Sequence, residues 1–432
     1  MAQSIELQSP QNPDHLDALA DMFGKTFSGY WDRVEDSRPN YFGNRNYDWQ
    51  ASKIGLSDGQ LVSHFGVWEY QMRIGVSLVR MAGIGAVATL KTMRGQGLMM
   101  KTATACVDSL RENGYDISLL FGIPNFYHRF GYVVTYPEAS FIVQLRDIPE
   151  SVTDVPYEEY TGDAADLARF YNKDNATVTG TYVRPTYLHV RNPKLRRCFT
   201  FDGGYVWVQH DGDILNVNDC AGPPECVVAV ARSIAATDIK PRIRFKFLPR
   251  RSPVGEYVQT LTNTYEAHHE RTGGPMFKII NIGSLFEKIT DELSRRLAES
   301  PMRAYSGTLV LADADEAVRL TITGGAVTAV EPAKAATDSP AAPAGDAAAA
   351  SSGVAPEAAT PDPGHAADAL RAANGADGAV AGGISLVRLV IGDGDPKRVC
   401  SQGSIGLSGD AADLVPILFP DQEPSTIQWD RF

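Results

Sequence analysis

The stretch VATLKTMRGQGLMMKTATACVDSL, residues 87–110, decides the fold of this chain. Its first four residues are typical of the end of a strand, and from Gly97 to Asn113 the pattern is helical. Four positions recur every four residues on one largely apolar helical face: Leu98, Thr102, Cys106 and Leu110. Gly114 stands where a glycine commonly caps a helix. The stretch therefore predicts a strand, a glycine-containing loop and a helix in direct succession.

The flanking sequence predicts that this helix crosses between two parallel strands. Residues 53–90 read as an antiparallel meander, in which GQLVSHFGVWEYQMRIG (59–75) shows apolar alternation. A further strand, Ile117–Phe121, follows the helix directly. Val87–Leu90 and Ser118–Phe121 can lie parallel only if the helix connects them, which makes a βαβ unit. We expect the catalytic loops where these two strands end.

Length and changes of pattern predict three domains of the α/β (α+β) class. A chain of 432 residues exceeds the size at which one hydrophobic core keeps growing. Residues 1–149 hold the βαβ unit. Residues 150–272 alternate strand and helix patterns again, with a hairpin expected around Asp211 and Gly212. The third expected domain comprises residues 273–432.

One segment of the third domain, residues 333–383, reads as a flexible insertion in a surface loop. It is dominated by Ala, Pro, Gly, Ser and Asp, contains no Phe, Tyr or Trp, and has Leu370 as its only leucine. Such a segment buries too little apolar surface to offset the entropy of ordering it. The patterned sequence on either side is the hairpin AVRLTITGGAVTAV (317–330) and the apolar segment ISLVRLVIG (384–392).

Charge and cysteine content exclude several classes of function. The chain has 40 Lys plus Arg against 52 Asp plus Glu, and its net charge of -12 would repel nucleic acids and anionic membranes. The five cysteines have neither zinc-site spacing nor the pattern of a disulfide framework: they are Cys106, Cys198, Cys220, Cys226 and Cys400. The N-terminal residues do not resemble an export signal. We therefore expect a soluble cytoplasmic protein with no metal, no nucleic acid partner and no membrane association.

The tetrapeptide Arg94-Gly95-Gln96-Gly97 is a candidate phosphate site. Glycines let the backbone approach a ligand closely, and the first amides of the following helix are unpaired donors at the positive end of its dipole. A pyrophosphate group suits such a position. A tight turn without a ligand has the same short signature, so the loop alone does not decide. A Rossmann site is excluded because the preceding strands form a meander and the third glycine is absent.

Together with GIPNFYHRFGYV (122–133), this loop resembles the GNAT acetyltransferase superfamily. The loop of that family reads Gln/Arg-x-x-Gly-x-Gly/Ala, and its later motif reads Tyr-x-x-x-Gly-Phe/Tyr. Both motifs occur here at the expected separation and on the expected elements. Thr92 departs from the first position of the loop motif, which removes one expected phosphate contact, and Arg94 is the residue that can compensate.

Within the superfamily, nearly the whole chain resembles the Eis-like (enhanced intracellular survival) acetyltransferases. TYVRPTYLHVRNP (181–193) lies in a region that resembles their degenerate second acetyltransferase-like domain. The later segments resemble their sterol carrier protein-like domain: FKIINIGSLFEKI (277–289), LVRLVIG (386–392), LVPILFP (414–420) and QWDRF (428–432). The Ala-rich insertion is a departure from that family. The resemblance also implies a homo-hexamer.

The resemblance implies acetyl-coenzyme A as the cosubstrate and assigns its site. Backbone groups of Val87, Ala88 and Thr89 are expected to hold the pantetheine arm and the thioester. The residues expected to cradle the pyrophosphate are Gly95, Gln96, Gly97, Leu98, Met99 and Met100. Gly122 and Ile123 match a further coenzyme contact after the next strand. A backbone amide near Val87 is a candidate donor to the oxyanion.

Acetyl transfer to an amine also needs an acid for the leaving thiolate and a base for the amine. Tyr127 matches the family's general acid, although spacing alone would also fit a core aromatic residue beside Phe126 and Phe130. The resemblance assigns the base to the C-terminal carboxylate, which here belongs to Phe432. Such a carboxylate has a low intrinsic pKa, so it must be buried or act through water. His128 is expected to be structural.

Aromatic and acidic residues of the first helical region could line an amine pocket or could equally belong to the core. They are Phe23, Phe27, Tyr30, Trp31, Asp32 and Glu35.

The leading function is direct N-acetyl transfer, in a ternary complex, to small cationic amines such as aminoglycosides or to protein lysines. The sequence does not separate these acceptors. One alternative is a lipid or sterol binding protein, which the last domain alone suggests and which predicts a continuous apolar cavity there. Another is a catalytically silent relative. Thr92 is its only support, whereas Tyr127, Gly95 and Gly97 oppose it.

Overall fold

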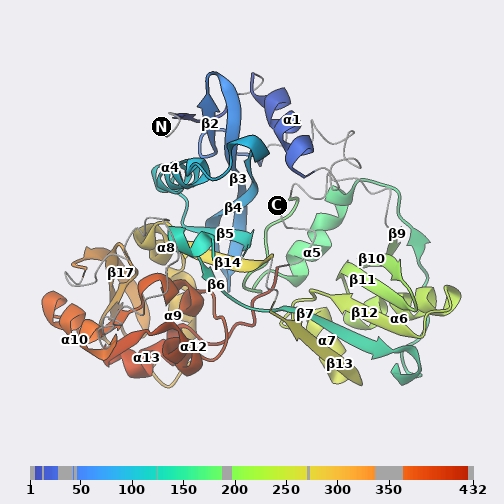
Figure 1. Cartoon of the computed structure of the whole chain (residues 1–432). Helices are drawn as coiled ribbons and strands as arrows, with labels where there is room; N and C mark the ends of the chain where they lie inside the picture. The colour runs from blue at the N-terminus through green and yellow to red at the C-terminus, as the bar shows by residue number, and fades with distance from the viewer. Residues whose placement is uncertain are drawn as a thin grey trace, which may run out of the picture. The chain divides into compact units, whose positions relative to one another are not determined.

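The computed structural model of the chain divides into two compact units, built around three sheets (Figure 1). The residues that the structure describes are 5–11, 14–27, 42, 46–123, 125–186, 197–269, 273–335 and 363–426. The first unit comprises Met1–Asn281, Ile391–Asp393 and Gln422–Phe432, and the second comprises Ile282–Val390 and Gly394–Asp421.

The first sheet has the strand order β1-β2-β3-β4-β5-β14-β6. Its strands are β1 (Glu6–Gln8), β2 (Lys53–Ser57), β3 (Gln60–Ile74), β4 (Ser77–Thr89), β5 (Ile117–Gly122), β14 (Gly274–Ile279) and β6 (Val133–Val134). Helices α1 (Leu16–Thr26) and α4 (Leu98–Glu112) pack against it, and the 3-10 turns η2 (Lys91–Met93) and η3 (Tyr127–Phe130) lie in its loops. The expected meander, crossover helix and following strand are confirmed.

The parallel pairing of β4 with β5 is present, but the expected register is wrong. The ladder runs from Met81 opposite Ile117 to Ile84 opposite Leu120, and does not join Val87–Leu90 to Ser118–Phe121. Beyond Ile84, β4 remains paired with β3 alone. The sequence pattern could not show this, because apolar runs mark where strands lie but not where their ladders stop.

The second sheet, also in the first unit, repeats this arrangement in the order β8-β9-β10-β11-β12-β7-β13. Its strands are β8 (Glu158–Glu159), β9 (Arg197–Phe201), β10 (Gly204–Asp211), β11 (Ile214–Ala221), β12 (Arg242–Lys246), β7 (Glu138–Gln144) and β13 (Asn263–His268). Its helical segments are η4 (Leu145–Asp147), η5 (Ala164–Leu167), α5 (Ala168–Asp174), α6 (Pro224–Thr237) and α7 (Pro253–Thr260). As in the first sheet, a hairpin, β10–β11, leads through a crossover helix, α6, to a parallel strand, β12.

Each of these two sheets contains one strand that comes from the other half of the unit. β7 follows β6 along the chain but pairs with β12 and β13. β14 follows β13 but pairs with β5 and β6. The two strands occupy equivalent places in the two strand orders, so the halves exchange one strand each. The expected divisions at residues 149 and 272 therefore separate β7 and β14 from the sheets in which they lie.

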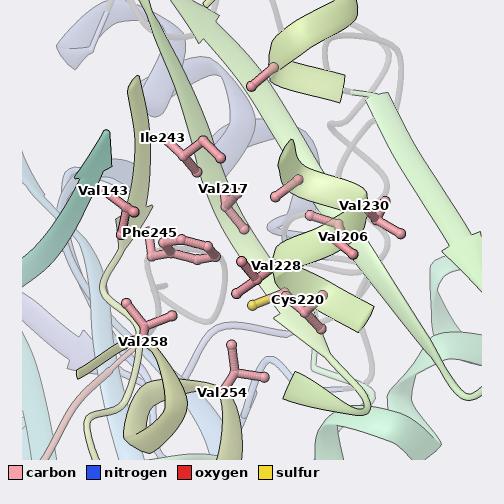
Figure 2. Close-up of a cluster of buried hydrophobic side chains, with 14 of the residues drawn as sticks. Val143, Val206, Val217, Cys220, Val228, Val230, Ile243, Phe245, Val254 and Val258 are labelled. Carbon is pink, nitrogen blue, oxygen red and sulfur yellow. The ribbon is translucent and has the colours of Figure 1, made fainter. Parts of the chain in front are cut away.

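The core of the second half fills the space between its sheet and helices α6 and α7 (Figure 2). Val217, Ile243 and Phe245 project from the sheet, and Val228 and Val254 meet them from the helices. Burial of one such side chain stabilises the fold by about 1.5–3 kcal/mol. This cluster covers one face of the sheet, and a second cluster that includes Tyr205, Trp207 and Ala221 covers part of the other face.

The sheet of the second unit has the order β17-β16-β15-β18-β19. Its strands are β15 (Gly307–Ala312), β16 (Ala317–Thr323), β17 (Ala326–Ala333), β18 (Gly378–Ala381) and β19 (Gly406–Gly409). Its helical segments are α8 (Ile282–Lys288), α9 (Thr290–Ala298), α10 (Pro363–Asn374), η8 (Gly383–Ser385), α11 (Leu386–Val390), α12 (Pro396–Gly403) and α13 (Ala411–Leu418). The expected Gly-Gly hairpin joins β16 to β17.

The expectation that residues 333–383 form one flexible insertion is wrong for 363–383. These residues include α10 and β18, and β18 pairs with β15 and β19. Leu370 and Ala379 are fully buried. Alanine has high helix propensity and packs where space is small, so Ala-rich composition did not prevent order here. Residues 336–362 of the segment lie outside the described residues.

None of the described helices is both long and apolar enough to cross a membrane. The five cysteines are free, and Cys106, Cys198 and Cys220 are buried.

An ion pair is buried in the second half of the first unit. Nη1 of Arg184 donates to Oδ2 of Asp219 over 2.6 Å, and the two side chains are 0% and 3% exposed. The hydroxyl of Tyr205 donates to the same oxygen over 3.0 Å. The guanidinium carbon lies 3.4 Å from the ring centroid of Tyr171. Loss of one partner would leave a buried charge without its counter-ion.

We predict that Asp219→Ala lowers the free energy of unfolding by about 3–5 kcal/mol, because Arg184 would remain buried without its counter-charge. Asp213→Ala is the matched control. Asp213 pairs with Arg242 at the surface, so its loss should leave the unfolding free energy close to that of the parent protein. Urea unfolding measures both variants, and equal effects would contradict the assignment.

Candidate active site

β4 carries a bulge just beyond the point where it leaves β5. Its ladder with β3 reaches Gly85 and resumes at Ala88, so Ala86 and Val87 have no partner residue in that ladder. The ladder with β5 has already ended. Ala86 has a φ of 54°, a left-handed conformation that costs a non-glycine residue roughly 1–2 kcal/mol. Neither ladder of β4 therefore gives Ala86 or Val87 a partner residue.

The glycine loop has the backbone conformation expected of an anion site. Gly95 and Gly97 have φ values of 79° and 74°, and a Cβ at either position would meet no atom within 4 Å. Gly97 is the N-cap of α4 and supplies no side-chain cap. The amides of the first helical turn, Leu98 to Met100, are consequently available to a ligand at the positive end of the helix dipole.

The remainder of the loop is exposed. Thr92, Arg94 and Gln96 all lie at the surface. Nε of Arg94 donates to the carbonyl of Thr89 over 3.3 Å, which links the two ends of the loop. The guanidinium of Arg94 is therefore the cationic group held beside the glycines. Thr92 of this chain stands at the motif position where the family has Gln or Arg.

The Tyr127 motif folds as a 3-10 turn with a glycine cap. Gly131 ends η3 with a φ of 80°, and its amide donates to the carbonyl of His128 over 3.0 Å. The hydroxyl of Tyr132 is 2.7 Å from Oγ of Ser118, which in turn donates to the carbonyl of Ala82. Glycine is required to leave the turn, and Tyr132 anchors it to β4 and β5.

Gly122 makes room for the ring of Tyr127. A Cβ on Gly122 would lie 2.6 Å from Cδ2 of Tyr127 and 2.7 Å from Sδ of Met276. The absence of a side chain at Gly122 thus decides where the phenol sits. Ile123, the next residue, is 52% exposed. The expected coenzyme contacts of Gly122 and Ile123 stay predictions.

Tyr127 presents an almost isolated hydroxyl on a buried ring. Its side chain packs beside Phe126, with ring centroids 4.9 Å apart, and the residue is 8% exposed. No described residue forms a hydrogen bond with the hydroxyl. Burial raises the pKa of Tyr127 to about 12, because the desolvated phenolate is disfavoured. The phenol therefore stays protonated at neutral pH.

One hydrophobic cluster brings the separate parts of the site together. Tyr127 belongs to it, and Val87, Met99 and Met100 pack against it from the bulge and from the first turn of α4. The structure thus gathers β4, the glycine loop and η3 on the same face of the first sheet. Ala88 is buried and Thr89 half-buried at the end of β4.

Other predicted residues are placed differently or are not described. Phe432 lies outside the described residues, as do Tyr30, Trp31, Asp32 and Glu35. Phe23 is buried, and its ring stacks on that of half-exposed Phe27 over 5.4 Å. His128 is exposed while Tyr127 is buried, so the two neighbouring side chains lie in different surroundings.

The chain enters the first unit again shortly before its end. Residues 422–426 belong to this unit, and Thr426 is 4% exposed. Oγ1 of Thr426 lies 2.6 Å from the hydroxyl of Tyr136. Oγ of Ser425 donates to the carbonyl of Phe247 over 3.1 Å. The residues that precede Phe432 are thus bound to the unit that contains Tyr127.

The sequence interpretation missed His64, a fully buried histidine on β3. Nδ1 of His64 is 2.8 Å from the carbonyl oxygen of Ala86, the residue with positive φ in the bulge. Nε2 is 2.8 Å from the hydroxyl of Tyr47. The available signal was a single titratable residue in the apolar strand QLVSHFGVW, which periodicity alone does not connect to β4.

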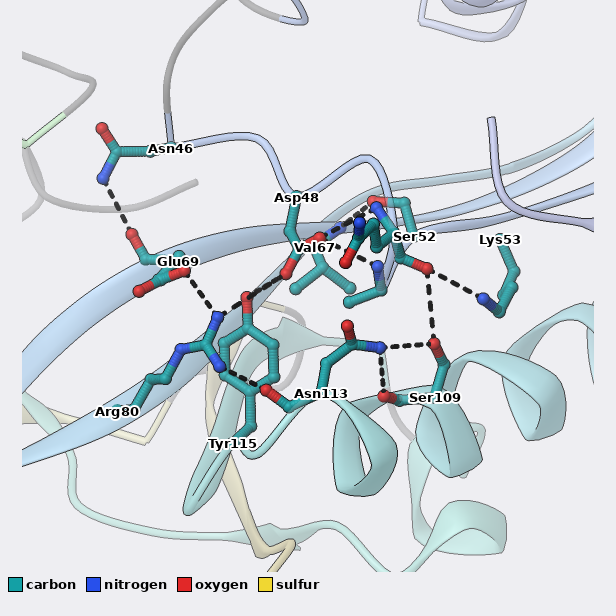
Figure 3. A network of polar contacts seen from close by, with 12 residues as sticks. Asn46, Asp48, Ser52, Lys53, Val67, Glu69, Arg80, Ser109, Asn113 and Tyr115 are labelled. Carbon is teal, nitrogen blue, oxygen red and sulfur yellow. Dashed lines mark hydrogen bonds and ion pairs between the residues drawn. The ribbon is translucent and has the colours of Figure 1, made fainter. Parts of the chain in front are cut away.

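A polar hollow of about 750 Å³ lies at the other end of α4. Figure 3 shows the network of polar contacts among several of the residues that line it. Its lining includes Glu112, Asn113 and Gly114 at the C-terminus of the helix, roughly 20 Å from Gly97 at 1.5 Å per residue. Arg80 donates to Glu69 over 2.7 Å and the hydroxyl of Tyr115 donates to Asp48 over 2.7 Å. These polar groups hold the sheet and helix to each other, away from the phenol of Tyr127.

In the described part of the chain, no three His, Cys, Asp or Glu side chains are grouped so as to hold a metal ion.

Comparisons with known proteins agree with this arrangement. Residues 7–135 match the family model described as an acetyltransferase (GNAT) domain. No curated protein sequence matches the chain. The GCN5-related N-acetyltransferase from Kribbella flavida has a TM-score of 0.64 and 17% identity, with 99% of this chain and 100% of that chain covered. That from Anabaena variabilis has a TM-score of 0.66 and 13% identity, with 98% of each chain covered. Eis1 from Mycobacterium abscessus has a TM-score of 0.64 and 14% identity, with 99% of this chain and 100% of that chain covered.

At these identities the solved structures show a shared fold, and the family model adds the relationship in sequence. The bulge, the glycine loop and Tyr127 all lie within the matched residues. Residues 7–135 therefore form a GNAT acetyltransferase domain, and over nearly its whole length the chain shares the fold of Eis1 and of the two GCN5-related N-acetyltransferases.

Proposed function

We propose that this protein transfers the acetyl group of acetyl-coenzyme A to an amine nitrogen, directly and in a ternary complex. One observation carries the proposal: the open N-terminus of α4 and the isolated, protonated phenol of Tyr127 meet at the same hydrophobic cluster. The first feature suits a pyrophosphate and the second suits a leaving thiolate. An anion site alone would not need a buried proton donor.

Each part of the candidate site is assigned one role in the reaction. Amides of Gly95 to Met100 bind the pyrophosphate, and the end of β4 orients the thioester. The Val87 amide, in the bulge, donates to the oxygen of the tetrahedral intermediate that forms when the amine attacks the thioester carbon. Tyr127 then gives its proton to the sulfur as the carbon–sulfur bond breaks. Its raised pKa keeps that proton in place until the thiolate forms.

The reaction also needs a general base that deprotonates the attacking amine. The carboxylate of Phe432 stays our prediction for it. The contacts of Thr426 and Ser425 support this role, because they tie the preceding segment to the unit that contains Tyr127. The acceptor is a small cationic amine or a protein lysine.

The second half of the first unit repeats the topology but lacks the features that would bind a coenzyme. Its crossover helix, α6, begins at Pro223 and Pro224, which have no amide hydrogen to offer. The amide of Gly222 already donates to Oδ2 of Asp174 over 2.7 Å. A carboxylate there would repel a phosphate. We infer that this half is a degenerate acetyltransferase domain, and that the second unit is the sterol carrier protein-like domain.

We predict that the protein releases free thiol from acetyl-coenzyme A only when a suitable amine is present. The test mixes the full chain with acetyl-coenzyme A and a panel of aminoglycosides, polyamines and lysine-containing peptides, and follows thiol release and acetylated product. Release with one acceptor class identifies the substrate. Neither release nor binding of the coenzyme would overturn the proposal and favour a lipid-binding or silent protein.

Tyr127→Phe should lower kcat by about 10²–10⁴-fold, because the leaving thiolate loses its proton donor. The stability should barely change, since the hydroxyl bonds to no described residue. Tyr132→Phe is the matched control: it removes a hydroxyl that bonds to Ser118, and should cost about 1 kcal/mol of stability with kcat retained. For the parent protein, phenol ionisation should not lower kcat until the pH approaches 12. A fully active Tyr127→Phe would contradict the assignment.

Gly97→Ala should raise the KM for acetyl-coenzyme A by about tenfold, a loss of roughly 1.4 kcal/mol in binding. Its Cβ would project into the open space at the start of α4. Gly212→Ala is matched in backbone strain, because Gly212 also has a positive φ and open space around it, in the β10–β11 turn. Steady-state kinetics should show an unchanged KM for Gly212→Ala, and a similar rise in both variants would argue against a coenzyme loop.

A further inference from the structure

His64 lies on the face of β3 that is opposite to the Tyr127 cluster. Side chains alternate along a strand, and the neighbouring Ser63 bonds to Thr102 of α4, with 2.6 Å between the two hydroxyl oxygens. His64 instead meets Phe23 of α1 edge to face, with ring centroids 5.6 Å apart. It is 0% exposed. The histidine therefore approaches the bulge from the side away from α4.

The partners of His64 determine which ring nitrogen carries the proton. The carbonyl oxygen of Ala86 can only accept, so Nδ1 must be protonated and donate to it over 2.8 Å. Nε2 then accepts from the hydroxyl of Tyr47 over 2.8 Å. Burial lowers the pKa of His64 to about 4, so the ring is neutral at neutral pH. Both nitrogens are satisfied by this single tautomer.

The hydrogen bond to Ala86 also orients the next amide. In a planar trans peptide the C=O and N–H bonds point in opposite directions. When His64 holds the Ala86 carbonyl on the α1 side, the N–H of Val87 must point away from His64. The side chain of Val87 packs against the cluster that contains Tyr127. The Val87 amide is thus directed away from His64, in a residue whose side chain contacts the cluster around Tyr127.

The bulge needs such a restraint because its backbone is strained. Ala86 adopts a φ of 54° without being a glycine, and neither ladder of β4 includes it or Val87. A strained residue persists when its surroundings over-determine it. The only side-chain hydrogen bond that the described residues make to the Ala86 carbonyl is that of His64.

We propose that His64 is a positioning residue, which holds the Ala86–Val87 peptide so that the Val87 amide meets the oxyanion of the acetyl-transfer reaction. This inference rests on the proposed acetyltransferase function. It assigns to His64 no proton transfer and no contact with substrate. The positioning role requires a hydrogen-bond donor at the position of Nδ1. The hydrogen bond that Nε2 accepts from Tyr47 serves only packing on the side of α1.

Three substitutions separate these two bonds. His64→Asn places an amide nitrogen where Nδ1 lies, so the donor to Ala86 can be kept while the bond to Tyr47 is lost. His64→Gln reaches the position of Nε2 and loses the donor to Ala86. Tyr47→Phe leaves His64 in place and removes only the partner of Nε2. Kinetics with a saturating amine acceptor, coenzyme affinity from calorimetry and thermal unfolding are measured for all three.

We expect His64→Gln to lower kcat by about 10- to 100-fold, the effect of a misplaced oxyanion donor, with the Kd for coenzyme A within twofold of the parent value. His64→Asn should recover most of that kcat although it is less stable. Tyr47→Phe should keep kcat within about twofold while losing stability, as expected for one buried hydrogen bond.

The outcomes distinguish this inference from the proposed function. If the parent protein transfers no acetyl group, the proposed function fails before any variant is compared. If the parent is active and His64→Gln retains its kcat, the positioning role is overturned while the function stands. If kcat in the three variants follows only their melting temperatures, with His64→Asn no better than His64→Gln, His64 is merely structural and the inference is also overturned.

Discussion

The end of the ladder between β4 and β5 at Ile84 is the constraint on which the active site depends. If the two strands stayed paired to their ends, every amide near Val87 would be used in the sheet. Because they part, Ala86 and Val87 have no partner residue on β5. The crossover helix α4 then begins beside the same strand end, which brings the unpaired amides of its first turn close to the bulge. Sheet topology therefore places an anion site and a candidate oxyanion donor together.

Local features of this arrangement could be predicted from sequence. The fourfold recurrence from Leu98 to Leu110 and the glycine at 114 specified α4 closely, because each depends only on neighbouring residues. The glycine loop was also predicted, since positive φ values at Gly95 and Gly97 suit the residue type that the motif shows. The motif around Tyr127 was identified by resemblance, and the turn that it forms was not predicted. The role of Phe432 stays a prediction, because that residue lies outside those described.

Features that depend on distant residues were not accessible in this way. The link between His64 and Ala86 joins positions 22 residues apart on paired strands, and it exists only because the bulge shifts their register. The space that Gly122 leaves for the ring of Tyr127 depends on a turn that begins five residues later in the chain. The order of residues 363–383 depends on β18 entering a sheet between β15 and β19, so composition alone gave the wrong answer there.

The exchange of strands between the two halves gives a physical reason why the half that contains Tyr127 is accompanied by a second half of the same topology. β14 follows the second half in the chain, yet it lies beside β5 in the first sheet. Its Met276 is 2% exposed and belongs to the cluster around Tyr127. Met276 and Gly122 approach so closely that no side chain fits at Gly122. The core around Tyr127 therefore includes a strand that follows the second half in the chain, so the fold of the second half is required whether or not that half binds a ligand of its own.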